Sequence, residues 1–371
     1  MVQDRRSFLR LSAGVTFLAG SGLAVGVVAE EDGDEANAED PIAWRYKGPH
    51  AIRNAIVGAG VLYTQTDGTL HAIDTSDGSP LWQRETPGAT RGPLLDETRG
   101  YLGGTPIRGF DQETGDLHWE SDLASPELAV GHDMVYTSSD GTIYALDPAD
   151  GAIRWERACL EGEVDGEVVI AESPILGTSD GQSVYAYDST VGQGGLIAVL
   201  DPETGESKAT MSHEGPITDL IAGSGHIAIV PDHDTAYLYD LATQEVSSRN
   251  SNTMAHILET GVYVTVRRYG TLQVFDLEET AEQRWDSTTG HGVPAIVEDR
   301  LISAYGIDPL DPAGSDDEDR VLAYDLGTGE ERWRHTFEES LWTGPETPIV
   351  ADRDQAFVSR DGQLLAIELG A

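Results

Sequence analysis

The sequence predicts an all-β fold, namely an eight-bladed β-propeller of four-stranded antiparallel blades whose ring is closed by the N-terminal strand. Three observations predict it. A turn motif that begins with an acidic residue returns eight times from Asp74 to Glu368, at a mean interval of about 42 residues, a period typical of propeller blades. Proline follows a small or apolar residue near the start of seven repeats. The last repeat ends before its outer strand, and an unused strand containing Trp44 lies near the N-terminus.

The first 29 residues are expected to be a twin-arginine signal peptide. Arg5 and Arg6 precede an apolar stretch, residues 11–28, that carries no charge, and this combination is typical of that export signal. A transmembrane anchor is the alternative, although a glycine-diluted stretch of this length barely reaches the roughly 20 residues needed to span a bilayer. We expect export by the twin-arginine route to an extracellular or cell-surface location. Residues 30–40 hold seven acids and are expected to form a solvated linker.

The charge balance excludes one class of function and suggests a salty environment. The chain has 65 Asp and Glu against 23 Lys and Arg, a formal net charge of −42, which excludes a nucleic-acid or anionic-membrane binder that works through a general basic surface. Only two of the basic residues are lysines, Lys47 and Lys208. Because concentrated salt screens such self-repulsion, we expect a halophilic protein; the alternative is a mesophilic acidic protein with bound divalent cations. The single cysteine, Cys159, excludes an intramolecular disulfide and a thiolate metal cluster.

The repeat itself is explained by turn chemistry. In the second copy, Asp111 is followed by Gly115 and then Trp119. An aspartate can bond to the backbone two residues further on, and a glycine can adopt the positive φ that a tight hairpin requires. The tryptophan then lies on the next strand, where it is expected to pack against the neighbouring blade. The residues assigned to this blade-docking role are Trp44, Trp82, Trp119, Trp155, Trp285 and Trp333.

Two repeats lack the docking tryptophan, and the ring needs its N-terminus to close. Ala209 and Ser248 stand in place of tryptophan in the fourth and fifth repeats, so those blade contacts are expected to be weaker. Trp44 has no turn motif before it, so its strand can complete the eighth blade, which protects sheet edges that would otherwise be open. Residues 41–371 are therefore predicted to form one propeller domain. An open β-sandwich array is the competing architecture, but it predicts neither the even period nor the split last blade.

Written as Ala/Gly-x-Asp-x-x-Thr-Gly-x-x-x-Trp, the repeat resembles that of the pyrroloquinoline-quinone (PQQ)-type β-propeller family, and the chain is expected to be an exported member of haloarchaeal type. The resemblance implies three functional classes: quinone-dependent dehydrogenases with PQQ and calcium, non-catalytic binding propellers, and sensor or adaptor domains. The dehydrogenases carry an adjacent cysteine pair beside the quinone, whereas this chain has only Cys159. Cys159 is interpreted as a small core or loop residue and not as a nucleophile.

Candidate binding residues lie in the segments that enter the inner strands and converge on one mouth of the central channel. They offer imidazoles, an arginine and an indole, which suit a small anion, a metal or a peptide carboxylate; the alternative is that they only solvate the channel mouth. The candidates are His50, Arg91, His213, His256, His291 and Trp342. A long acidic segment is a weaker candidate for calcium, and the alternative is a disordered loop; its acids are Asp308, Asp311, Asp316, Asp317 and Asp319.

These observations predict an exported, non-catalytic binding or scaffold module for a protein or small ligand. No cofactor is predicted. The alternative function is that of a PQQ-dependent dehydrogenase or a degenerate relative, and only this alternative would require PQQ and calcium. A cell-surface assembly adaptor is the third possibility. The chain is expected to be a monomer, to bind no nucleic acid and to have no transmembrane span once mature.

Overall fold

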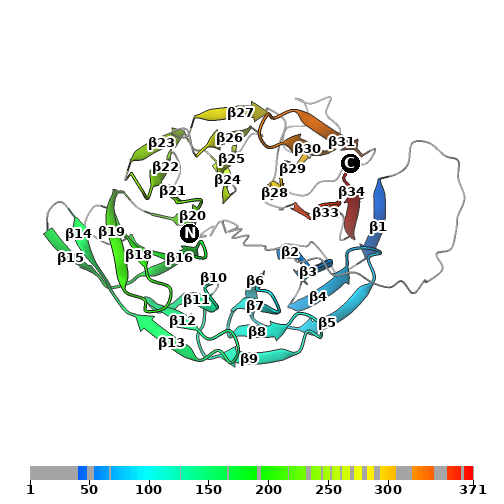
Figure 1. Ribbon diagram of the computed structural model, residues 1–371. Helices are drawn as coiled ribbons and strands as arrows, with labels where there is room; N and C mark the ends of the chain where they lie inside the picture. The colour runs from blue at the N-terminus through cyan, green and yellow to red at the C-terminus, as the bar shows by residue number, and fades with distance from the viewer. Residues whose placement is uncertain are drawn as a thin grey trace, which may run out of the picture.

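The computed structural model confirms an all-β eight-bladed propeller (Figure 1). The signal and linker predictions, residues 1–40, lie outside the residues that the structure describes. The described ranges are 41–47, 54–66, 68–125, 127–164, 167–189, 194–215, 217–230, 235–243, 245–250, 253–259, 261–267, 271–277, 282–287, 293–305, 320–337, 349–360 and 363–370.

Each blade is a meander in which the first strand lies toward the middle of the ring and the last strand lies outside (Figure 1). Blade 1 is β2 (Asn54–Gly58), β3 (Val61–Thr66), β4 (Thr69–Asp74) and β5 (Pro80–Glu85). Blade 2 is β6 (Ala89–Leu95), β7 (Arg99–Gly104), β8 (Ile107–Asp111) and β9 (Leu117–Ser121). Blade 3 is β10 (Leu128–Gly131), β11 (Met134–Ser139), β12 (Thr142–Leu146) and β13 (Ile153–Arg157). Blade 4 is β16 (Ile175–Ser179), β17 (Val184–Asp188), β18 (Gly194–Leu200) and β19 (Ser207–Glu214).

The second half of the ring repeats the same order, and an extra hairpin precedes blade 4. Blade 5 is β20 (Asp219–Gly223), β21 (His226–Val230), β22 (Thr235–Asp240) and β23 (Val246–Asn250). Blade 6 is β24 (Thr253–Glu259), β25 (Val262–Arg267), β26 (Leu272–Asp276) and β27 (Gln283–Ser287). Blade 7 is β28 (Ala295–Val297), β29 (Arg300–Tyr305), β30 (Arg320–Asp325) and β31 (Glu331–Thr336). Blade 8 is β32 (Val350–Ala351), β33 (Gln355–Arg360), β34 (Gln363–Glu368) and β1 (Ile42–Lys47), and the hairpin is β14 (Leu160–Val164) with β15 (Glu167–Ala171).

The N-terminal strand closes the ring, as predicted. β1 pairs antiparallel with β34, and Trp44 lies opposite Ala366. The two segments lie side by side although they come from opposite ends of the chain (Figure 1). The described part of the chain contains no helix long and apolar enough to cross a membrane.

The tryptophans dock neighbouring blades, also as predicted. The Trp44 Nε1–H donates to the carbonyl of Thr75 in blade 1 at 2.7 Å. The later tryptophans repeat this contact one blade further on, always to the residue that follows the acidic residue of the turn: Trp82 to Gln112 at 3.0 Å, Trp119 to Pro148 at 3.0 Å, Trp155 to Pro202 at 2.9 Å and Trp285 to Leu326 at 3.0 Å. Trp333 packs against Gly370, where an added Cβ would lie 2.6 Å from the ring. These contacts seal the apolar core between blades.

The structure changes the residue assigned to one of the two docking positions that lack a tryptophan. In blade 4, Ala209 pairs with Val199 on the neighbouring strand, at the tryptophan position expected from the sequence. In blade 5 the last two strands pair without the bulge found in other blades, and Ser247 lies opposite Leu238. Ser247, and not Ser248, therefore occupies the docking position, because the sequence count assumed a bulge that this blade lacks.

Candidate functional site

Arg91 is the one predicted channel-mouth residue that makes a described contact between blades near the entry to the inner strands. It lies on β6, and its Nη2 is 3.8 Å from Oε2 of Glu127, which leads into β10. Both side chains are about three-quarters buried. The pair links blades 2 and 3, so a ligand would meet a balanced ion pair there and not a bare cation.

His213 does not open onto the channel mouth, contrary to the prediction. It lies on β19, the outer strand of blade 4, and only 5% of its surface is exposed. Its Nδ1 is 3.0 Å from the hydroxyl of Tyr239, and its ring meets the Tyr237 ring edge-on at 4.7 Å. Both tyrosines belong to blade 5, so His213 is a packing residue between blades. Burial lowers its pKa, although the charge of Glu214 opposes the shift.

The other predicted ligand residues are not brought together by what the structure describes. The backbone of His256 lies in β24 opposite Thr265. His50, His291 and Trp342 lie outside the described residues, and so do the acids proposed for calcium, Asp308, Asp311, Asp316, Asp317 and Asp319. Within the described ranges, no group of three or more His, Cys, Asp or Glu side chains is placed to hold a metal ion. Cys159 is half-buried just before β14, and its carbonyl accepts a bond from Arg157 Nε at 3.1 Å.

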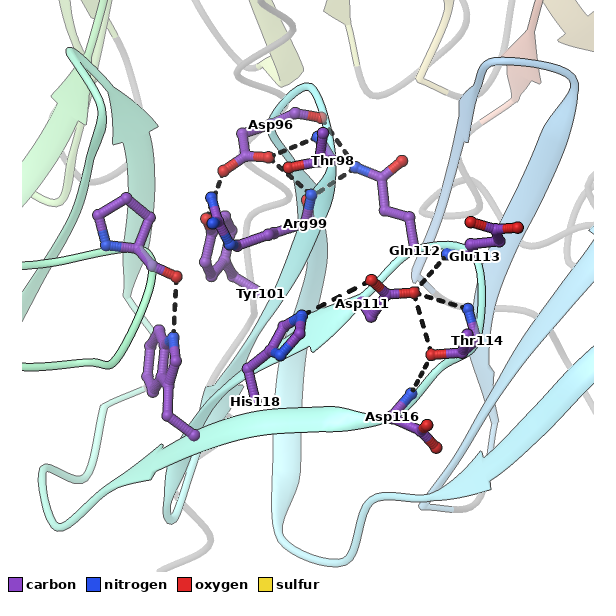
Figure 2. Close-up of polar contacts among 12 residues, drawn as sticks. Asp96, Thr98, Arg99, Tyr101, Asp111, Gln112, Glu113, Thr114, Asp116 and His118 are labelled. Carbon is purple, nitrogen blue, oxygen red and sulfur yellow. Dashed lines mark hydrogen bonds and ion pairs between the residues drawn. The ribbon is translucent and has the colours of Figure 1, made fainter.

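The acidic turns form polar networks, and Figure 2 shows the one in blade 2. Oδ1 of Asp111 accepts bonds from the backbone N–H of Thr114 at 2.8 Å and from its hydroxyl at 3.0 Å. These bonds, the backbone bond first, hold the pKa of Asp111 below its usual value. The Gln112 amide donates to the carbonyls of Asp96 and Arg99, each at 2.8 Å. The carboxylate of Asp111 thus holds its own turn, and Gln112 joins that turn to the preceding one, so both side chains have a structural role.

A row of buried tyrosines was not found by sequence reasoning. Each follows an apolar or glycine residue near the start of the second strand of its blade and is at most 2% exposed: Tyr63, Tyr101, Tyr136, Tyr185 and Tyr263. Tyr63 donates to the same Gln112 carbonyl as Trp82, at 3.2 Å, and burial raises its pKa to about 12. The repeated pair of a small or apolar residue and tyrosine was the available signal. These side chains support the docking contacts and do not form a ligand site.

The inserted hairpin β14–β15 is the most exposed apolar feature of the described residues. The sequence showed only a stretched fourth repeat here. Leu160 and Ala171 are buried at the hairpin base, whereas Val168 is 81% exposed and Ile170 is 58% exposed. β15 pairs only with β14, so its other edge carries no strand among the described residues. The hairpin projects from the ring between blades 3 and 4 (Figure 1).

Comparison with known proteins places these features in a family. The family model for the outer membrane protein assembly factor BamB matches residues 24–250 and 193–370. A quinohemoprotein alcohol dehydrogenase from Comamonas testosteroni is 28% identical over 182 residues, which are 47% of this chain and 22% of that enzyme. This chain thus covers about a fifth of the length of that relative.

Solved structures agree on the fold. The crystal structure of BamB from Moraxella catarrhalis has a TM-score of 0.59 and 16% identity, covering 86% of this chain and 98% of that chain. A computationally designed protein, Ika8, has a TM-score of 0.64 and 15% identity, covering 88% of this chain and 99% of that chain. At these identities the likeness shows the fold alone.

Proposed function

This chain belongs to the family of the outer membrane protein assembly factor BamB, and from that membership we propose that it is a non-catalytic binding or scaffold module for a protein partner. The family is that of an assembly factor, which supports this class. We further propose that the protein is exported by the twin-arginine route and works in concentrated salt at or outside the cell surface, as the first 29 residues and the charge of −42 suggest.

The observation that carries the proposal is the exposed edge of β15. Val168 and Ile170 lie two residues apart, so they project from the same face of the strand. An extended segment of a partner can add to such an edge through backbone hydrogen bonds while its side chains contact the apolar pair. Glu161, Glu163 and Glu167 surround this pair in the sequence, which favours a partner segment with basic residues near its apolar ones.

A capture experiment in multimolar salt tests the proposal. The wild-type protein and a Val168→Asp/Ile170→Asp variant would be used to recover partners from the exported fraction of the source cells. Leu81→Asp is the matched control, because Leu81 is 49% exposed on the outer strand of blade 1, which does not adjoin the hairpin. We expect a partner retained by the wild type and the control and lost with the double variant. Equal recovery by all three proteins would reject the hairpin as the binding surface.

A quinone-dependent oxidoreductase is the second candidate, favoured by the partial match to the alcohol dehydrogenase. The residues present do not fit the group well. Cys159 is the only cysteine, and it lies beside the outer strand of blade 3, away from the inner strands, while Arg91 is paired with Glu127. Purified protein mixed with PQQ and calcium would separate the candidates: dye-linked alcohol oxidation would establish the enzyme, and we expect none.

A further inference from the structure

A pocket of ≈ 470 Å³ opens between blades 5 and 6, where the outer strand of blade 5 has no docking tryptophan. It is lined by Ser224, Gly225, His226, Asp240, Ala242, Gly261 and Leu277. Leu277 follows Asp276, so it holds the same place in blade 6 as the carbonyl acceptors of the docking indoles hold in their blades. Asp240 begins the corresponding turn of blade 5. The pocket therefore joins the two turns that a docking strand would bridge.

In blades 3, 6 and 7 an adjacent pair of residues on the outer strand fills both of these roles, whereas Leu81 and Ala43 precede the docking tryptophans of blades 1 and 8. In blade 6, Arg284 bonds to Asp276 of its own blade at 2.6 Å, and Trp285 donates to Leu326 of the next blade. Blade 3 uses Arg154 and Trp155 in the same way, and blade 7 uses Arg332 and Trp333. A basic residue followed by tryptophan is thus the recurrent occupant of this position.

Blade 5 supplies neither half of that pair. By strand register Ser247 takes the place of the indole. The arginines of blades 3, 6 and 7 lie in a bulge of the outer strand, and because blade 5 pairs without that bulge, its outer strand has no residue in the place of the base. Oδ1 of Asp240 accepts the backbone N–H of Ala242 at 2.7 Å, and Oδ2 faces His226 Nε2 at 4.0 Å. The pocket thus combines a carboxylate that has no arginine beside it among the described residues with Leu277, the counterpart of the residues whose carbonyls accept the docking indoles in other blades.

We propose that this pocket binds a basic residue followed by tryptophan in an extended segment of a partner protein. The basic side chain would pair with Asp240 and the indole would lie against Leu277, so the partner would supply in trans what blades 3, 6 and 7 supply in cis. This inference uses a surface distinct from the β15 edge, and either can fail without the other.

Two acetylated dipeptide amides of opposite charge test the proposal by calorimetry, at the lowest salt in which the protein stays folded. We expect Arg-Trp to bind at least tenfold more tightly than Glu-Trp. Asp240→Asn is expected to abolish this preference, whereas Asp150→Asn, at an exposed turn of blade 3, is expected to keep it. Equal binding of the two dipeptides by the wild type would overturn the proposal. Tryptamine binding more tightly than Arg-Trp would also overturn it, because the site would then suit a free aromatic amine.

Filling the pocket from within provides an independent test. Ser247→Trp is expected to place an indole of the chain itself in the pocket, abolish Arg-Trp binding and raise the melting temperature, while Ser247→Ala is expected to bind as the wild type does. Should the tryptophan variant fail to fold, Ala242→Tyr blocks the rim of the same pocket. Unchanged dipeptide affinity in either blocked variant would contradict the assignment.

Discussion

At the scale of single residues, the docking tryptophans dictate where glycine must stand. A Cβ added to Gly78 would lie 2.6 Å from the Trp44 ring, and one added to Gly115 would lie 2.5 Å from the Trp82 ring. The pairing holds around the ring: where blades 4 and 5 lack the tryptophan, the residue four positions after the next turn aspartate is Gln244 or Thr280 instead of glycine. Each docking indole therefore packs against the backbone of a glycine, where a larger residue would overlap the ring.

Gly115→Ala tests that contact, with Gly181→Ala as its control. Both glycines have positive φ, 71° and 78°, but nothing lies within 4 Å of a Cβ added to Gly181. The control isolates the cost of the left-handed backbone, about 1–2 kcal/mol. Gly115→Ala is expected to cost about 1–3 kcal/mol more because the methyl overlaps the indole. Denaturant unfolding in salt measures both, and equal costs would refute the steric account.

Buried histidines are expected to make the fold sensitive to acid. Burial lowers the pKa of His213 and of His71, so the unfolded chain, with imidazole pKa values near 6.5, binds more protons than the folded one as the pH falls below that value. The free energy of unfolding is therefore at its full value above about pH 6.5 and falls as the pH drops below it. His213→Gln removes one of these two imidazoles and is expected to reduce the loss of stability between pH 7.5 and 5.5, measured by denaturant unfolding at the two pH values. An unchanged pH dependence in His213→Gln would contradict this.

At the scale of elements, the hairpin β14–β15 divides into a buried base and an exposed strand. Leu160 is fully buried against blade 4, and Val168 is 81% exposed. Leu160→Ala is expected to cost about 2–5 kcal/mol through lost burial and the cavity left behind, and Val168→Ala less than about 0.5 kcal/mol. Thermal and urea unfolding provide the comparison. Similar costs for the two truncations would show that the hairpin does not dock through its base.

The sequence predicted the repeating elements far better than the site. Turn motifs and docking tryptophans repeat, so each copy supports the others, and strand order and closure followed from them. The inserted hairpin occurs once, and its two strands could not be distinguished from extra loop length. His213 was placed at a loop because β18 and β19 are unusually long: Gly195 pairs with His213, which draws that side chain into the sheet. Single-copy features depend on contacts between blades that no repeat reveals.

At the scale of the whole molecule, the acidic surface is expected to make stability depend on salt. The net charge is −42, and the Debye length falls from about 10 Å at 0.1 M to about 3 Å at 1 M salt, so self-repulsion weakens steeply over this range. The melting temperature is expected to rise between 0.1 and 1 M NaCl and to level off above it. Maximal stability in dilute buffer would contradict the halophilic proposal.

Ring closure by β1 is the central claim, and disulfide trapping tests it most directly. Lys47 pairs with Gln363, and residues opposite each other in an antiparallel pair lie within the Cα separation that a disulfide spans. In a Cys159→Ser background, Lys47→Cys/Gln363→Cys is expected to form an intramolecular disulfide on mild oxidation, detected by mass spectrometry. Lys47→Cys/Glu368→Cys, which places the thiols at opposite ends of the strand pair, is expected not to. Failure of the first pair to cross-link, or equal cross-linking of both, would contradict closure of the ring by its N-terminal strand.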